Sequence, residues 1–158
     1  MPAPEEIDFP TLLDFPAPHL RSYTRESMVA EKFEAMVKLG MLNTRMKDFF
    51  DVWTVSQEFA FFGPTLGKAI KATFETRGTA VPNKPPLALS PEFYDDREKN
   101  AQWKAFLNKA KLNAEGKSLA EIAKALRVFL VPVSEAVASG EILKRNWEPS
   151  GSWVVLAP

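Results

Sequence analysis

The sequence predicts a mainly α protein, a bundle of about five helices preceded by a proline-rich extended segment. Three observations carry this prediction. Apolar residues recur at helical spacing over most of the chain, capping residues precede two of these stretches, and prolines gather between them. The 158 residues correspond to one ordinary domain. We therefore expect an extended segment over residues 1–22, a helical domain over 23–140 and a tail over 141–158.

The composition argues against several kinds of site. The 20 basic and 20 acidic side chains give zero net charge, so binding to nucleic acid through bulk charge is not expected. The chain has no cysteine and a single histidine, which argues against disulfides, a zinc site and a histidine-based triad, and we predict no metal-ligating residues. It shows no signal peptide and no apolar run that could span a bilayer, so we expect a cytoplasmic protein without a membrane partner.

The first 20 residues hold five prolines, which predict an extended loop because proline fixes φ and removes a hydrogen-bond donor. Apolar residues stand between these prolines, which is unusual for a free tail. They indicate a segment that lies along another surface: Phe9, Leu12, Leu13, Phe15 and Leu20.

Three helices are expected in the first half of the chain. The first spans residues 24–39, with Thr24 as its N-cap and Gly40 as its stop. A short turn leads into a second helix over residues 44–61. Apolar residues at every fourth position then predict a third helix over residues 65–75.

Residues 77–91 hold four prolines and predict a long loop that is either functional or packed along the surface. A fourth helix is expected over residues 95–111. Its apolar stripe includes Trp103 and Phe106, and we interpret both as core residues rather than base-stacking residues.

The second half ends with a fifth helix and a tail. Ser118 and Glu121 form a capping box that opens the helix, and Pro132 is expected to end or kink it, with a short helical piece continuing to about Ala138. One short strand is expected in the tail, over residues 153–156.

Lys32 is the charged residue of the first helix that does not fit a solvated face. At roughly 100° per residue it falls between Met36 and Leu39, inside the apolar arc. Glu31 and Glu34, in contrast, are expected to project into solvent. A lysine on a buried arc must snorkel, pair with an acid or serve a site.

The second helix supplies acids for this lysine. Helices joined by a short turn pack antiparallel, and Lys32 and Asp48 each stand eight residues from Gly40. The hairpin therefore places Lys32 beside Asp48 and Asp51, with Arg45 nearby. On this geometry two interpretations are equally good: a salt-bridge network that fixes the register of the hairpin, or a functional site.

Two stretches of this hairpin resemble the third and fourth motifs of the AbiEii/AbiGii toxin family of nucleotidyltransferases. They are RESMVAEKFEAMV over residues 25–37 and NTRMKDFFD over residues 43–51. Three further stretches are similar to that family, so that the resemblance runs to about residue 135: Phe9 to Pro18, Arg77-Gly-Thr79 and Trp103-x-x-Phe106-Leu107.

The resemblance implies the helical lobe of a nucleotidyltransferase-like fold. In that family an amino-terminal α/β core carries a Gly-Gly or Gly-Ser turn and an Asp-x-Asp pair, which holds Mg²⁺ on the incoming nucleoside triphosphate. The helical lobe closes the cleft. The resemblance implies that Lys32 touches the triphosphate and that Asp48 acts near the attacking hydroxyl or the nucleotide. Arg45 and Asp51 support them, and Lys47 is a further nucleotide-binding residue.

The sequence departs from the family pattern because no Gly-rich turn followed by Asp-x-Asp is present. We therefore expect a carboxy-terminal lobe, from a truncated gene, a split system or an excised fragment, that is inactive alone and holds neither Mg²⁺ nor nucleotide tightly. The expected partners are the missing amino-terminal lobe or an antitoxin, with an RNA acceptor and self-association as further options. The alternative is a non-catalytic helical module whose apolar amino-terminal segment binds a partner protein.

Overall fold

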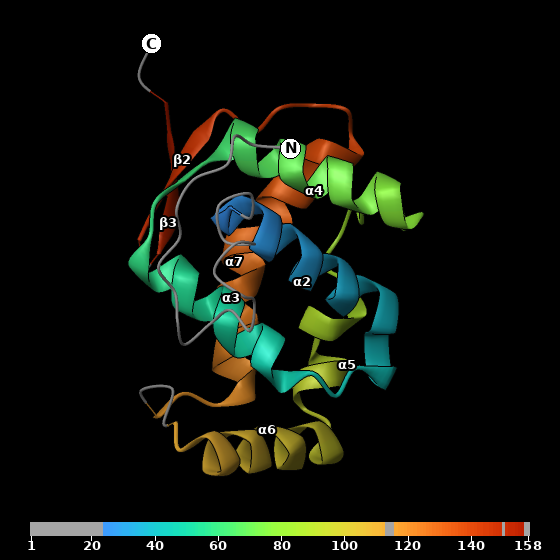
Figure 1. Cartoon of the computed structure of the whole chain (residues 1–158), viewed down its shortest axis with the longest axis vertical. Helices are drawn as coiled ribbons and strands as arrows, with labels where there is room; N and C mark the ends of the chain where they lie inside the picture. The colour runs from blue at the N-terminus through green and yellow to red at the C-terminus, as the bar shows by residue number, and fades with distance from the viewer. Residues whose placement is uncertain (1–23, 113–115, 150, 157–158) are drawn as a thin grey trace.

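The computed structural model describes residues 24–112, 116–149 and 151–156. Within these ranges six α-helices surround a buried core and a small sheet lies at one side, which confirms the expected mainly α class (Figure 1). The expected extended segment over residues 1–22 lies outside the described residues. None of the helices in the described ranges is long and apolar enough to cross a membrane.

The α-helices follow one another along the chain with short connections, except for one long loop between the third and the fourth. They are α2 (Arg25–Leu39), α3 (Met46–Glu58), α4 (Gly63–Arg77), α5 (Pro91–Tyr94), α6 (Arg97–Ala110) and α7 (Leu119–Ala138). Two 3-10 helices and three strands complete the described fold: η1 (Gly40–Leu42), η2 (Leu87–Leu89), β1 (Phe61–Phe62), β2 (Arg145–Glu148) and β3 (Ser152–Val155).

The predicted caps are confirmed at both ends of the helical region. The Thr24 hydroxyl accepts a hydrogen bond from the backbone N–H of Ser27 at 3.0 Å and opens α2. Ser118 and Glu121 form the expected capping box of α7. Gly40 ends α2 with a φ of +51°, a conformation that favours glycine.

The helix α7 differs from its prediction because it passes through Pro132 without ending. Of the two outcomes expected at Pro132, the end of the helix was wrong, and the helix continues to Ala138 as expected for the piece that follows the proline. Buried side chains on both sides of the proline, Phe129 and Leu130 before it and Val133 after it, attach the two halves of α7 to the core. This packing outweighs the loss of the hydrogen bond that the proline ring removes.

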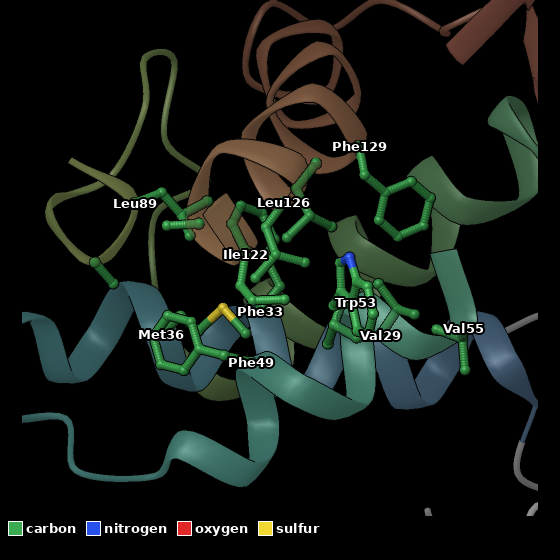
Figure 2. Close-up of a cluster of buried hydrophobic side chains, with 14 of the residues drawn as sticks. Val29, Phe33, Met36, Phe49, Trp53, Val55, Leu89, Ile122, Leu126 and Phe129 are labelled. Atoms are coloured by element: carbon green, nitrogen blue, oxygen red, sulfur yellow. The ribbon is translucent and has the colours of Figure 1, made fainter. Parts of the chain in front are cut away.

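The core lies where α3 and α4 pack against the central helix α7 and where α2 packs against α4; Figure 2 shows part of it. Phe33 of α2, Phe49 of α3 and Ile122 of α7 are fully buried members of this one cluster. The long loop after α4 closes one side of the core, because Leu89 of η2 is also fully buried. Of the two roles expected for that loop, packing along the protein is therefore the one observed.

The small sheet has the order β1-β2-β3 with antiparallel pairing, whereas the sequence pattern predicted only the last of these strands. The prediction missed β1, which has two residues and pairs with residues far along the chain, and β2, which has only four residues. Trp147 of β2 is buried and its indole N–H donates to the carbonyl of Ser56 at 2.7 Å. The indole N–H of Trp153 in β3 donates to the carbonyl of Phe129 at 3.0 Å. The β2–β3 hairpin is therefore attached to both α3 and α7.

Candidate functional site

The hairpin of α2 and α3 brings Lys32 level with two carboxylates, as the spacing predicted. The Lys32 Nζ lies 3.0 Å from Asp48 Oδ1 and 3.2 Å from Asp51 Oδ2. The Lys32 side chain is 16% exposed, and those of Asp48 and Asp51 are 5% and 1% exposed. One ammonium group therefore lies at the edge of the protein and pairs with two buried acids.

Two further cations from the start of α3 join this cluster. Lys47 Nζ lies 2.8 Å from Asp51 Oδ2, and Arg45 Nε lies 2.9 Å from Asp48 Oδ2. The charge-bearing ends of both side chains reach the surface. The five residues, which we call the Lys32 cluster, thus hold three positive and two negative charges, and its excess charge is positive.

The buried acids of this cluster are chemically unequal. Burial raises the pKa of the Asp51 carboxyl above its ordinary value, while the hydrogen bond from Lys47 and the charge of Lys32 act in the opposite direction. Asp48 keeps one buried oxygen, Oδ2, that accepts no hydrogen bond from the described residues although Arg45 lies beside it. Because this oxygen is buried and lies 2.9 Å from Arg45 Nε, it becomes open to a ligand only when Arg45 moves away.

The Lys32 cluster opens onto a cleft of about 560 Å³. The turn before α3 and the start of α3 form one wall with Lys32, and one face of α6 forms the other. The residues that line it are Lys32, Thr44, Arg45, Met46, Lys47, Asp48, Gln102, Ala105, Phe106 and Lys109. Four of these side chains are cations and one is a carboxylate, so the cleft suits an anionic ligand.

The wall from α6 was missed at the sequence level. Gln102 and Lys109 are seven residues apart and therefore share a face of α6, but nothing in the sequence tells which element that face meets. The prediction that Trp103 and Phe106 belong to the core holds for Trp103, which is buried. Phe106 is only half-buried. One side of its ring packs against the core as predicted, and the side chain also lines the cleft, which was not predicted.

A buried lysine attaches the two walls to each other. Lys99 of α6 is 5% exposed, and its Nζ donates to the carbonyl of Asn43 at 2.8 Å and lies 5.3 Å from the ring centroid of Phe93. The Asn43 side chain in turn accepts from the backbone N–H of Arg45 at 2.7 Å. Lys99 therefore fixes the turn that presents Arg45 to the cleft.

A second charged cluster lies elsewhere on α2 and corrects the expectation that Glu34 projects into solvent. Glu34 is 2% exposed, accepts a hydrogen bond from the Thr79 hydroxyl at 2.6 Å and pairs with Arg77 at 3.2 Å. Arg77 also lies 2.6 Å from Glu31. The expectation for Glu34 failed because its partners stand more than 40 residues further along the chain.

A family model described as nucleotidyl transferase AbiEii toxin, type IV toxin–antitoxin system, matches residues 1–126. The chain belongs to the AbiEii family. The matched region includes both walls of the cleft and both charged clusters, and it ends within α7, before the β2–β3 hairpin. No curated protein and no solved structure matches the chain. Family membership agrees with the resemblance drawn from the hairpin motifs, while the roles of individual residues stay predictions.

Proposed function

We propose that this AbiEii-family chain forms the helical lobe of a nucleotidyltransferase toxin and that the cleft beside Lys32 binds the triphosphate of the incoming nucleotide. The observation that carries this proposal is the position of Lys32, which pairs with two buried acids and still lines an open, positively charged cleft. A purely structural ion pair has no need of an excess of cations, whereas a cleft alone decides little, because the Glu34–Arg77 pair also borders one.

The proposed roles follow from the donors that each side chain offers. An ammonium group has three N–H donors, so contacts to Asp48 and Asp51 leave one from Lys32 for a phosphate oxygen. Lys47 and Arg45 provide further positive charge at the mouth of the cleft. Asp51 holds Lys32 in place from the buried side.

Asp48 is the residue we assign to the attacking group. Its side chain lines the cleft, and its Oδ2 lies 2.9 Å from Nε of Arg45, a side chain that is 57% exposed. In nucleotidyl transfer an acceptor oxygen bonds to the α-phosphorus, the bond to the leaving pyrophosphate breaks, and the proton of the acceptor passes to water. When Arg45 turns toward the triphosphate, Asp48 Oδ2 would accept the hydrogen bond of that hydroxyl and orient it.

The Lys32 cluster suits a triphosphate but does not suit Mg²⁺. Mg²⁺ prefers oxygen ligands, and both carboxylates are already flanked by cations at 3.2 Å or less. A divalent ion here would add positive charge to a cluster that is already positive. We propose that the metal-binding carboxylates belong to a nucleotidyltransferase core outside this cleft, so that this lobe alone binds triphosphate weakly and transfers nothing.

A second candidate is a protein-interaction module, since every charged group of the Lys32 cluster has a partner within the hairpin. Type IV toxin–antitoxin membership makes an antitoxin the natural partner. Leu42, at the tip of the hairpin, is 83% exposed and would suit such a contact. This candidate predicts that Leu42→Ser abolishes antitoxin binding while triphosphate binding is absent throughout.

Calorimetry separates the two candidates. Each of the four ribonucleoside triphosphates with Mg²⁺ is titrated into the full chain, alone and together with a nucleotidyltransferase core protein from the same source. We expect Lys32→Met to weaken binding at least tenfold, while Lys38→Met, an exposed lysine on the same helix, leaves it unchanged. Lys47→Gln serves as a second probe if Lys32→Met unfolds. Equal affinity of the original chain and both cluster variants, or no binding by any of them, contradicts the proposal.

A further inference from the structure

We infer that Phe106 of α6 is the platform on which the base of the bound nucleotide stacks, and that Gln102 contacts the edge of that base. This inference rests on the proposed function, because it assumes that the triphosphate lies against the Lys32 cluster. It goes further by assigning the two walls of the cleft to the two chemically different ends of one ligand.

The surroundings of Phe106 give its ring a fixed position. Its centroid lies 5.9 Å from that of Phe50 of α3 and 5.7 Å from that of Trp103 of α6. Trp103 is itself buried and its indole N–H donates to the carbonyl of Lys117 at 3.3 Å. A half-buried ring that is braced on its inner side loses little conformational freedom when a ligand covers it.

The contacts of Phe106 also leave room for a stacked ring. The plane of the Phe106 ring is inclined at 59° to that of Phe50 and at 38° to that of Trp103, so both contacts are tilted. No aromatic ring of the described residues stacks on it in parallel. Parallel stacking of a base on an aromatic side chain is the common way in which proteins hold a base without reading its sequence.

Gln102 supplies a polar group beside this ring. It precedes Phe106 by four residues, so both lie on one face of α6, and both line the cleft. Its hydrogen bonds inside the protein are long: 3.4 Å from Lys99 Nζ and 3.5 Å to Glu98. A carboxamide that is held weakly can exchange these contacts for the donor and acceptor groups of a base edge.

The two walls together match a nucleotide rather than a simple anion. The hairpin wall offers cations from Lys32, Arg45 and Lys47, whereas the α6 wall offers an aromatic ring and an amide beside one cation, Lys109. Inorganic phosphate chains would use the cations but neither the ring nor the amide. The cleft volume of about 560 Å³ also lies in the range of small-molecule sites.

The experiment compares a nucleoside triphosphate with inorganic tripolyphosphate, which has the charge but no base. Calorimetry measures both ligands on the original chain, Phe106→Leu, Phe106→Tyr and Lys32→Met, in the same buffer with Mg²⁺ and the core protein used above. Phe106→Leu is expected to lower the affinity for the nucleoside triphosphate roughly tenfold and to leave the affinity for tripolyphosphate unchanged. Phe106→Tyr keeps an aromatic face and should retain both affinities.

The outcomes separate this inference from the function on which it rests. If Lys32→Met weakens both ligands while Phe106→Leu changes neither, or both equally, the triphosphate site stands and the base platform is overturned. If neither ligand binds the original chain, both proposals are overturned. Urea unfolding of Phe106→Leu and Phe106→Tyr checks that the two variants are equally folded, so that a difference between them reports on stacking.

Discussion

The two charged clusters on α2 differ in how they use their charges. In the Lys32 cluster three cations surround two buried acids, and the cluster lines an open cleft. In the second, which we call the Glu34 cluster, Arg77 is shared between Glu34 and Glu31, and Thr79 completes the hydrogen bonds of Glu34. Lys32 and Glu34 are only two residues apart and so lie on different sides of the helix.

The two clusters differ in the elements that they join and in their net charge. Arg77 is the last residue of α4, and Gly78 after it adopts a positive φ, which turns Thr79 back toward α2. The Glu34 cluster thereby joins the end of α4 to α2, with its acid in the interior. The Lys32 cluster joins α2 to α3 in a similar way, but its charges sum to one positive, whereas those of Glu31, Glu34 and Arg77 sum to one negative. Each cluster borders a cleft, since Glu34 and Arg77 line one of about 390 Å³ together with Lys38 and Arg45. Ion pairs and an adjoining cleft therefore do not indicate function by themselves; the excess of positive charge is what favours an anion at the Lys32 cluster.

The largest effect on stability is expected from Lys32→Met. Removing the shared cation leaves Asp48 and Asp51 buried with one partly exposed cation each, and we expect unfolding free energy to fall by about 3 kcal/mol. Lys38→Met on the same helix is exposed and should change it by less than about 0.5 kcal/mol. Urea unfolding at neutral pH measures both. A loss for Lys32→Met no larger than for Lys38→Met would show that the pair contributes nothing.

A smaller loss is expected from Glu34→Gln, which removes the charge of the Glu34 cluster and keeps its shape. Arg77 and Thr79 lose a charged acceptor, and the unfolding free energy should fall by about 2 kcal/mol. Triphosphate affinity should not change, because Glu34 does not line the cleft beside Lys32. Urea unfolding and calorimetry on the same sample test this separation. If Glu34→Gln weakens triphosphate binding as much as Lys32→Met, the comparison between the two clusters is wrong.

The sequence predicted those features that depend on neighbours along the chain. Thr24, Gly40 and Ser118 mark helix ends because a cap acts within one turn, and their predictions are confirmed. The meeting of Lys32 with Asp48 was also predictable, since a short turn fixes the register of two antiparallel helices.

Features that depend on distant contacts were not predictable in this way. Glu34 is buried by partners that follow it by more than 40 residues, and no helical wheel contains them. The face of α6 that carries Gln102 and Phe106 becomes a cleft wall only because Lys99 attaches that helix to the turn before α3. A single sequence gives the polarity of such a face but not the element that it meets.

The pH dependence of stability gives a finer test of the Lys32 cluster through Asp51→Asn. Burial raises the pKa of Asp51 in the folded protein above its ordinary value of 3.8, so between these two values the folded state binds more protons than the unfolded state. The contribution of Asp51 to stability therefore falls as the pH rises through this window. As the pH rises, the original chain should lose stability relative to Asp51→Asn, because the asparagine side chain does not titrate. Urea unfolding from pH 3.5 to 7 measures the difference; a constant or opposite trend would show that Lys32 and Lys47 outweigh burial.

The smallest effect on stability is expected from Arg45→Gln. Its effects on stability and on triphosphate affinity should be the reverse of those of Arg77→Gln. Arg45 is 57% exposed and pairs with Asp48 within one helical turn, so its loss should cost only about 0.3–0.5 kcal/mol. It lines the cleft, however, and its loss should weaken triphosphate binding by roughly tenfold at low salt, less as salt screens the charge.

Arg77→Gln should behave in the opposite way. It removes the shared cation of the Glu34 cluster and leaves a buried carboxylate with only the Thr79 hydroxyl, so stability should fall more than in Arg45→Gln. Triphosphate affinity should stay unchanged. Each variant removes one arginine, so a nonspecific loss of positive charge would lower the affinity of both alike. That outcome would show that the net charge of the lobe, rather than the Lys32 cluster, attracts the anion.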